Sequence, residues 1–413
     1  MYYIGIDWAD QKYDIVILDD SGKYVQEPLV IKKSQPGFNE LLKIFQKLSP
    51  QPEDFKIGIE TPTDLLINFL VFWDYPLFSV HPTSMKSFRK RYRTTNARDD
   101  SYDAFVLADV ARTDSVCWKK VQQDSDLTNQ IRTLVFDHHR FIQRHTAAHN
   151  SFKETLKQYY PEYNQFFKDV SCPASLAFFQ QFPTFNQATE LTKEQLTNFF
   201  RTYKIYNNKT ISRIYNILHN DHIQVNEYIV VTKIMMASGY ARQLVELKKT
   251  CHEYEKLLNT ALNQHPDTET FISFPGIAET TAGRLIALFG DHRELHCNAF
   301  PFQAKAGTCP VTETTGYDKN SKKGYKIVYY RVGCHKVYRD FVRNMAFASL
   351  TKADWIKAYY DKHRNMGHHH HHALRCLANL QLKILFAMWK HQKIFDENIY
   401  LAQRTRQAMK QIK

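Results

Sequence analysis

Apolar residues in the first 115 positions form short runs, and polar turns separate one run from the next. Runs rich in Ile, Val and Tyr predict strands, in which alternate side chains share a face. We predict strands at 2–7, 13–19, 24–31, 56–60 and 77–80. Helices are predicted from Ser34-Gln35-Pro36 to about Gln46, after Pro62, and from about Ser101 to Thr113. Strands interleaved with helices favour an α/β domain over residues 1–115.

The pattern changes after residue 115, where glycine becomes rare and apolar residues recur every three or four positions. Leu127 to about Tyr160 and Glu227 to about Leu262 are predicted as long helices, which can pair as a coiled coil within one chain or between chains. Thr192 and Gln195 fit a capping box at the start of a shorter helix. This helical region spans 116–265.

Residues 266–413 are predicted to be mainly α-helical. Phe274-Pro275-Gly276 resembles the turn of a helix-hairpin-helix element, whose backbone amides can hold a nucleic-acid phosphate. A hydroxyl-rich stretch from Ala306 to Gly316 is expected to be a loop. Glycine at its ends and cations after it are compatible with a phosphate site, and a polar surface loop is the alternative.

Two nearly identical strings end in a carboxylate. Residues 4–7 read Ile-Gly-Ile-Asp and residues 57–60 read Ile-Gly-Ile-Glu, so each predicted strand ends at an acid. A glycine two residues before each acid is expected to leave open space on the acid's face. Asp100 and Asp103 lie three apart on a predicted helix and are neighbours there.

Four such carboxylates suit a hard divalent cation. Mg²⁺ or Mn²⁺ prefers oxygen ligands, and a two-metal site can act on phosphodiester oxygens. We therefore expect Asp7, Glu60, Asp100 and Asp103 to converge on one metal site. The alternative is structural, because acids are common in turns and at helix starts.

The net charge favours a polyanionic partner. Lys and Arg number 55 against 42 Asp and Glu, which gives a formal charge of +13. Neutralising phosphates is the main source of nonspecific affinity for nucleic acids. The clustered cations, whose alternative role is a solvated surface, are Arg89, Lys90, Arg91, Arg93, Lys319, Lys322, Lys323, Lys326, Arg331, Lys336 and Arg339.

The cysteine and hydropathy patterns indicate the cellular compartment in which the protein is expected. The seven cysteines are scattered without a C-x-x-C pair, which argues against a zinc site or disulfide framework and for a reducing cytosol. No apolar run is long enough to span a bilayer, so we expect a soluble cytoplasmic protein without a membrane partner. The tract His368 to His372 is expected to be exposed and non-functional, with metal binding as the alternative.

The chain resembles the transposases of one bacterial insertion-sequence family, which are related to the Piv-type DNA invertases. The resemblance covers nearly the whole chain. Its residues are Gly5-Ile6-Asp7, Glu60-Thr61-Pro62, Asp100-x-x-Asp103-Ala104, Leu107-Ala108, Phe274-Pro275-Gly276, Ala306-Gly307, Pro310-Val311-Thr312, Arg331-x-x-Cys334, Gly367 and Ala373-Leu374-Arg375. The combination is specific, whereas the single pieces are not.

The resemblance implies a RuvC-like (RNase H-like) DEDD domain and a C-terminal transposase domain. It places the four acids on Asp7, Glu60, Asp100 and Asp103, and the nucleophile, usually a serine, on Thr315 before Gly316. Members of the family use a structured bridge RNA to choose donor and target DNA, and recombination of two duplexes implies a dimer or tetramer. Threonine keeps the hydroxyl but adds a methyl group that restricts χ1. An active variant, an inactivated copy and an engineered substitution all remain open.

Two other functions are compatible with these residues. One is a junction-resolving, structure-specific nuclease that uses the four acids for hydrolysis. The other is a catalytically inactive nucleic-acid-binding relative. The complete set of acids argues against the second, and the missing serine argues mildly for it.

Overall fold

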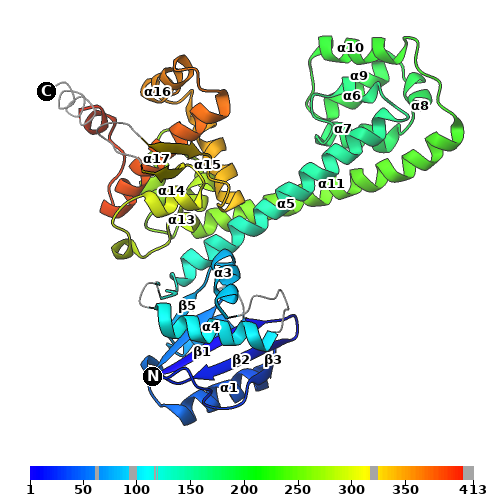
Figure 1. The fold of residues 1–413 in the computed structure, drawn as a ribbon. Helices are drawn as coiled ribbons and strands as arrows, with labels where there is room; N and C mark the ends of the chain where they lie inside the picture. Colours follow the sequence, from blue (N-terminus) through cyan, green and yellow to red (C-terminus); the bar gives the residue numbers. More distant parts are fainter. Residues whose placement is uncertain (61–64, 93–99, 116–117, 119, 317–323, 403–413) are drawn as a thin grey trace. The chain divides into compact units, whose positions relative to one another are not determined.

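The structure is a computed structural model of the 413-residue chain. It describes all residues except 61–64, 93–99, 116–117, 119, 317–323 and 403–413 (Figure 1). The side chain of Asp100 also lies outside the described part. Contacts divide the chain into two compact units, Met1–Gln123 and Asp124–Lys413, and each is described by itself. The three predicted parts, 1–115, 116–265 and 266–413, stay a prediction.

Unit Met1–Gln123 is built on a five-stranded mixed sheet in the order β3-β2-β1-β4-β5. The strands are β1 (Tyr2–Trp8), β2 (Lys12–Leu18), β3 (Leu29–Lys32), β4 (Phe55–Ile59) and β5 (Leu77–Ser79). β1 runs antiparallel to β2 and parallel to β4, and β4 runs parallel to β5. The predicted strand 24–31 is too long, because Tyr24 makes only an isolated bridge to Leu18. The arrangement is consistent with the expected RNase H-like domain.

Helices cover both faces of this sheet (Figure 1). They are α1 (Gln35–Leu48), α2 (Leu65–Phe72), α3 (Pro82–Tyr92) and α4 (Asp100–Asp114). The isoleucines of β1 and β4 pack with α1 and α2 on one face. On the other face, Tyr3, Val16 and Leu18 pack against Ala104 and Ala108 of α4. The period of two along each strand therefore separates two apolar layers.

Two long helices run antiparallel in unit Asp124–Lys413. They are α5 (Asp126–Lys157) and α11 (Glu227–Leu262), as the sequence predicted. Phe141 contacts Tyr254 at a centroid distance of 5.3 Å, and His138 Nε2 lies 3.6 Å from a carboxylate oxygen of Glu255. Whether the pair has coiled-coil geometry stays a prediction.

Five short helices between the long ones form a separate apolar cluster with them. They are α6 (Tyr163–Phe166), α7 (Pro173–Gln181), α8 (Phe185–Thr189), α9 (Lys193–Thr202) and α10 (Asn208–Leu218). The predicted capping box is confirmed at the start of α9. The Gln195 amide donates to Thr192 Oγ1 at 3.2 Å, and the Thr192 amide donates to Gln195 Oε1 at 2.9 Å.

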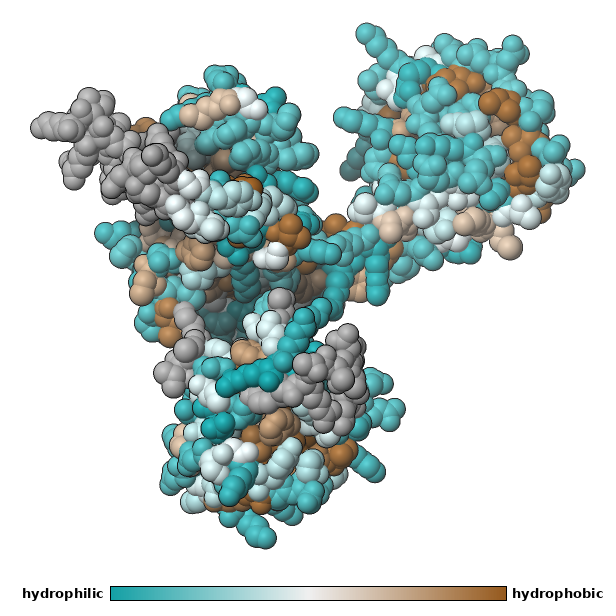
Figure 2. Space-filling model, viewed as in Figure 1, coloured by the Kyte–Doolittle hydropathy of each residue, from teal (hydrophilic) through white to brown (hydrophobic). Residues whose placement is uncertain are grey.

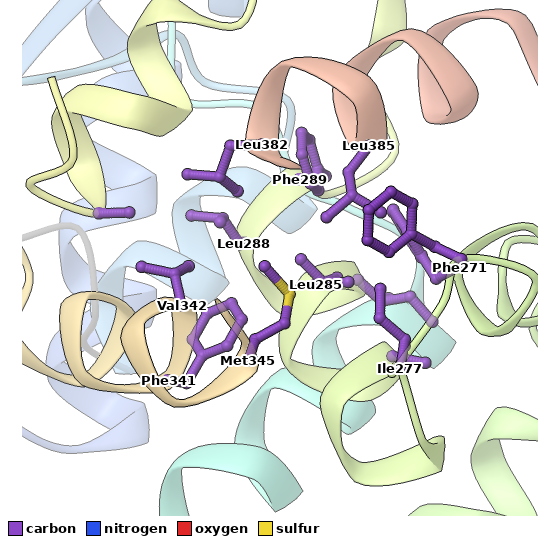
Figure 3. Packing of buried hydrophobic residues seen from close by; sticks show 14 of the residues in the cluster. Phe271, Ile277, Leu285, Leu288, Phe289, Phe341, Val342, Met345, Leu382 and Leu385 are labelled. Atoms are coloured by element: carbon purple, nitrogen blue, oxygen red, sulfur yellow. The ribbon is translucent and has the colours of Figure 1, made fainter. Parts of the chain in front are cut away.

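The C-terminal helices share a second cluster with the other ends of α5 and α11. They are α12 (Thr268–Ile272), α13 (Glu279–Phe289), α14 (Phe300–Lys305), α15 (Lys336–Ser349), α16 (Asp354–Asn365) and α17 (His370–His391). Figure 3 shows Leu285 and Leu288 of α13 among side chains of α15 and α17. No helix in the described ranges is long and apolar enough to cross a membrane.

The predicted turn at Phe274-Pro275-Gly276 does separate two helices, α12 and α13. Gly276 has φ +88°, and a Cβ there would lie 3.0 Å from Ser349 Cα at the end of α15. Glycine is required for the backbone angle and for this close approach. The turn is thus packed against the unit's own backbone.

Candidate functional site

The first two predicted acids lie side by side at one edge of the sheet. The parallel register pairs Ile6 of β1 with Ile59 of β4. Asp7 directly follows Ile6, and Glu60 directly follows Ile59. Parallel strands end at the same edge, so both carboxylates leave the sheet together.

The two glycines do not leave the open space that the sequence suggested. Gly5 pairs with Gly58, and α4 crosses directly over them. A Cβ on Gly5 would lie 1.8 Å from the carbonyl oxygen of Ala104, and one on Gly58 would lie 2.5 Å from that of Leu107. The expectation was wrong because a helix backbone fills the space. The close approach carries Asp103, the residue before Ala104, toward the strand ends.

Arg89 of α3 holds Asp103 in a bidentate contact. Its Nε donates to Oδ1 at 2.6 Å and its Nη2 to Oδ2 at 2.7 Å, and Asp103 is buried. The same Nη2 lies 3.8 Å from Oε2 of Glu60. Tyr102 donates a hydrogen bond to the Arg89 carbonyl at 3.1 Å, which ties α3 to α4.

The electrostatics place Asp7 in the same group. The pKa of Arg89 is raised, first by its hydrogen bonds to Asp103 and further by the charges of Asp103, Glu60 and Asp7, which outweigh its partial burial. The Arg89 guanidinium therefore interacts electrostatically with three of the four predicted acids. Asp100 begins α4 one turn before Asp103.

Arg89 was predicted to contact nucleic acid, which stays a prediction, and within the chain its side chain contacts the acidic group. The side chain points into the acidic group and is only partly exposed. Lys90 and Arg91 are exposed on α3, and Arg93 lies outside the described residues. Sequence reasoning missed the role of Arg89 because the two partners are 14 residues apart on different helices.

The hydroxyl-rich stretch forms a β-hairpin, so the predicted loop is wrong at 311–315. Strands β6 (Val311–Thr315) and β7 (Tyr325–Tyr329) pair antiparallel, with Thr315 opposite Tyr325. Thr315 is exposed at the end of β6, and Gly316 follows with φ +58°. Lys319, Lys322 and Lys323 lie outside the described residues, whereas Lys326 is on β7. Short strands rich in threonine resemble polar loops in sequence.

A small basic cavity lies beside this hairpin in the same unit. Its volume is about 130 Å³, and Arg339, Arg343, Arg375, His371 and Tyr330 are among its lining residues. The Arg375 guanidinium lies 4.7 Å from the centroid of the Tyr330 ring.

Interactions around the basic cavity affect its net charge. Asp340 lies 3.4 Å from Nε of Arg339 and 3.8 Å from Nη2 of Arg343. Thr308 also lines the cavity and donates to Asn379 Oδ1 at 2.9 Å. One carboxylate faces several cations here, which leaves an excess of positive charge.

Sequence reasoning identified only Arg339 among the arginines of this cavity. Arg343 follows it by one helical turn, so the spacing was a signal. Arg375 lies on α17 and could be joined to the others only by the fold. Of the remaining predicted cations, Lys336 is exposed, and Arg331 contacts the Cys309 carbonyl at 3.4 Å.

Comparison with known proteins finds a family model that is similar to the N-terminal part of the chain. Residues 4–161 match the family model DEDD_Tnp_IS110, described as a transposase. This part of the chain is therefore similar to the DEDD domain of IS110-type transposases. The matched range contains Asp7, Glu60, Asp100 and Asp103.

Full-length relatives extend the similarity. A Streptomyces coelicolor protein named for the transposase of the IS117 mini-circle is 26% identical over 416 residues, covering 96% of this chain and 95% of that protein. An uncharacterized 43.6 kDa protein of insertion element IS110 from the same organism is 22% identical and covers 73% of each chain. The similarity to the first relative includes both units of this chain.

Proposed function

We propose that this chain is a DNA transposase, a site-specific recombinase that cuts and rejoins DNA with a hydroxyl nucleophile and an acidic metal site. One observation carries the proposal. In a domain of the IS110 DEDD type, Asp7, Glu60 and Asp103 gather around one guanidinium at the ends of adjacent parallel strands.

The acidic residues fit Mg²⁺ or Mn²⁺ in donor type. Carboxylate oxygens are the ligands these ions prefer. Asp7, Glu60, Asp103 and Asp100 would hold the ion, which would supply neutralisation of charge on the transferring phosphate. Arg89 now balances the negative charge of these carboxylates. Its contact with Asp103 therefore has to open before a metal ion can bind the same oxygens.

Thr315 is the proposed nucleophile. Its hydroxyl lies on an exposed strand end, open to a DNA backbone. Attack forms a bond from Thr315 Oγ1 to phosphorus and breaks the bond from phosphorus to one sugar oxygen, which leaves as a hydroxyl. The threonine proton passes through a base to the leaving sugar oxygen. The phosphodiester link to protein conserves the bond energy that a second strand's hydroxyl needs to rejoin DNA.

Nucleic-acid contacts are proposed for the cations of both units. The basic cavity with Arg339 and Arg375 suits a backbone phosphate, because guanidinium groups bind phosphate oxygens in pairs. Net charge of +13 and the family resemblance support DNA and a structured bridge RNA as partners. Affinity for both should fall steeply with salt.

Self-association is proposed through α11. Tyr228, Val231 and Met235 recur at helical spacing and are 70%, 62% and 77% exposed. Figure 2 shows apolar side chains gathered over the α8 region and the neighbouring end of α11, on a mostly hydrophilic face. Large exposed apolar side chains on one helix face favour a contact with a second copy, in a dimer or tetramer.

The test is capture of a covalent protein–DNA adduct. Full-length protein with its co-purified RNA, Mg²⁺ and labelled DNA from the ends of its own element should give a denaturation-resistant adduct. Thr315→Ser should keep or raise adduct yield and strand exchange, because it retains the hydroxyl and removes one methyl. Thr315→Ala should abolish both while RNA and DNA binding persist.

The remaining variants separate the alternatives. Asp7→Asn should abolish exchange by weakening the metal site. Cleavage without an adduct, unchanged in Thr315→Ala, would instead identify a junction-type nuclease. If Thr315→Ala recombines as well as the parent, Thr314 or Thr312 on the same strand becomes the candidate nucleophile. Binding with no cleavage in the parent or in Thr315→Ser would identify an inactive relative.

A further inference from the structure

A second cluster of metal-binding side chains lies where α16 meets α17. His363 is near the end of α16, His368 lies in the turn, and Cys376 is on the second turn of α17. One ligand atom from each of the three lies within 4.8 Å of the other two. In the described part of the chain, the ligand atoms of this group are close enough together to hold a metal ion after small side-chain movements, whereas the acidic residues surround Arg89.

The two histidines are placed closely enough to share an ion. Their Nδ1 atoms are 3.1 Å apart. A tetrahedral ion with Zn–N bonds of about 2.0–2.1 Å separates two nitrogen ligands by about 3.3 Å. The observed separation, now a hydrogen bond between the two rings, is close to that value. A zinc ion would take the place of the shared proton, and the thiol of Cys376 would move toward the pair.

The backbone holds this geometry before any ion binds. Gly367 has φ +84°, which reverses the chain after α16, and the His368 amide donates to the His363 carbonyl at 3.2 Å. Arg364 donates to the His368 carbonyl at 2.9 Å. A left-handed glycine after a helix allows such a reversal without strain.

His372 is the candidate for a fourth ligand. His372 lies four residues before Cys376, so both side chains share a face of α17. Its ring stacks on that of His368 at a centroid distance of 4.1 Å and an interplanar angle of 17°. Side-chain rotation at His372 can turn a ring nitrogen toward the other three residues.

We propose that His363, His368 and Cys376, with His372 as the fourth ligand, form a structural Zn²⁺ site that ties α16 to α17. Three imidazoles and one thiolate select zinc over magnesium. The site is separate from the acidic site and does not rest on the proposed function. The proposal differs from two expectations, that the cysteine pattern argues against zinc and that the histidine tract is exposed and non-functional.

Cobalt provides a test that reports the sulfur ligand directly. Full-length protein without an added affinity tag, stripped by a chelator, is titrated with Co²⁺. A site with Cys376 should take up one equivalent with a thiolate-to-cobalt charge-transfer band in the near ultraviolet and tetrahedral visible absorption. Cys376→Ser should remove the charge-transfer band, whereas Cys297→Ser, which changes an exposed cysteine elsewhere, should leave it unchanged.

Stability measurements provide the second readout. Zn²⁺ should raise the melting temperature of the parent and of His371→Ala, whose residue belongs to the tract but not to the site. His363→Ala, outside the tract, should lose this increase and bind zinc at least about tenfold more weakly. Cobalt bound without a charge-transfer band, or zinc bound equally by the parent and His363→Ala, would mean that the tract alone binds metal and would overturn the proposal.

Discussion

At the scale of single residues, Arg89 decides the state of the acidic site. It contacts Asp103 through two hydrogen bonds and lies 3.8 Å from Glu60. Several carboxylates close together repel one another unless a cation balances them. A guanidinium and a divalent ion are alternative solutions, so the two should compete.

Arg89→Gln is expected to tighten metal binding at the acidic site. Removing the positive charge leaves the carboxylates free to bind a cation, so the Kd for Mn²⁺ should fall several-fold, measured by electron paramagnetic resonance of free Mn²⁺. Lys90→Gln removes a charge from the exposed neighbouring position and is the matched control. Weaker binding in Arg89→Gln would show that the arginine positions the carboxylates instead of competing with the ion.

His265 is expected to make the stability of unit Asp124–Lys413 depend on pH. Its Nδ1 accepts a hydrogen bond from the Asp267 amide at 3.1 Å, so Nε2 carries the proton and lies 2.9 Å from Thr128 Oγ1. Burial lowers the pKa of His265, although Asp267 and Asp291 oppose the shift. Protonation of Nδ1 would remove the acceptor for the Asp267 amide.

Stability should therefore fall as the pH drops below the ordinary histidine value of about 6.5. The unfolded chain then binds a proton that the folded chain excludes, and the stabilising contribution is lost as the pH falls through the lowered pKa. The measurement is the urea midpoint of unit Asp124–Lys413 in the full chain at pH 7.5 and at pH 5.5. Hydrogen exchange is the readout that reports the unfolding of this unit. His265→Gln should narrow the difference between the two pH values, and an unchanged difference would contradict the assignment.

At the scale of elements, the contact between α4 and the sheet depends on two glycines. Gly5 and Gly58 leave no room for a β-carbon, because carbonyl oxygens of α4 lie 1.8 and 2.5 Å from where it would be. Backbone atoms cannot move aside as a flexible side chain can. The paired glycines thus set the height of α4 above the sheet and with it the position of Asp103.

Gly58→Ala is expected to destabilise the α4–sheet contact by about 3 kcal/mol, at the upper end of the usual cost of overpacking. Backbone amides of α4 should exchange hydrogen more than tenfold faster in mass spectrometry. Gly239→Ala is the matched control, because apart from its chain neighbours and the nearby backbone of α11 no atom lies within 4 Å of its β-carbon position. That change should stabilise α11 by about 0.5–1 kcal/mol and leave α4 unchanged. Equal exchange in Gly58→Ala and the parent would show that α4 is not held by this contact.

A charge on the apolar face of α11 tests the proposed self-association. Met235→Glu places a carboxylate on a side chain that is 77% exposed in the single chain. Folding should be unaffected, whereas the oligomer should dissociate at concentrations where the parent remains associated, measured by sedimentation velocity. Leu257→Glu, at an exposed apolar position nearer the other end of α11, is the control and should associate like the parent. If Met235→Glu associates as the Leu257→Glu control does, the exposed apolar face of α11 is not the contact between copies.

At the scale of the whole molecule, chemistry is distributed between two compact units. The carboxylates belong to Met1–Gln123, and Thr315 with the basic cavity belongs to Asp124–Lys413. Strand transfer by the proposed mechanism requires both at one phosphodiester, within a chain or across an oligomer. A mixture of Asp7→Asn and Thr315→Ala proteins tests this, because exchange is restored only if different chains supply the two sites.

The sequence by itself determined the local elements and the strand-end acids. Alternation in Ile4-Gly5-Ile6-Asp7 fixes which side chains share a face, and the spacing of Thr192 and Gln195 fixes a helix start, because both patterns act over a few residues. These predictions needed no knowledge of neighbouring elements. Thr315 was found through a family resemblance, since no periodicity singles out one threonine among several.

Only the tertiary structure decided which distant residues meet. Nothing within a few residues of Arg89 indicates Asp103 as its partner, and Arg375 joins Arg339 only because α17 packs beside α15. The glycines before Asp7 and Glu60 were read as empty space because a one-dimensional pattern does not contain the helix that crosses them. His363, His368 and Cys376 likewise come together only when the turn at Gly367 folds α16 back onto α17.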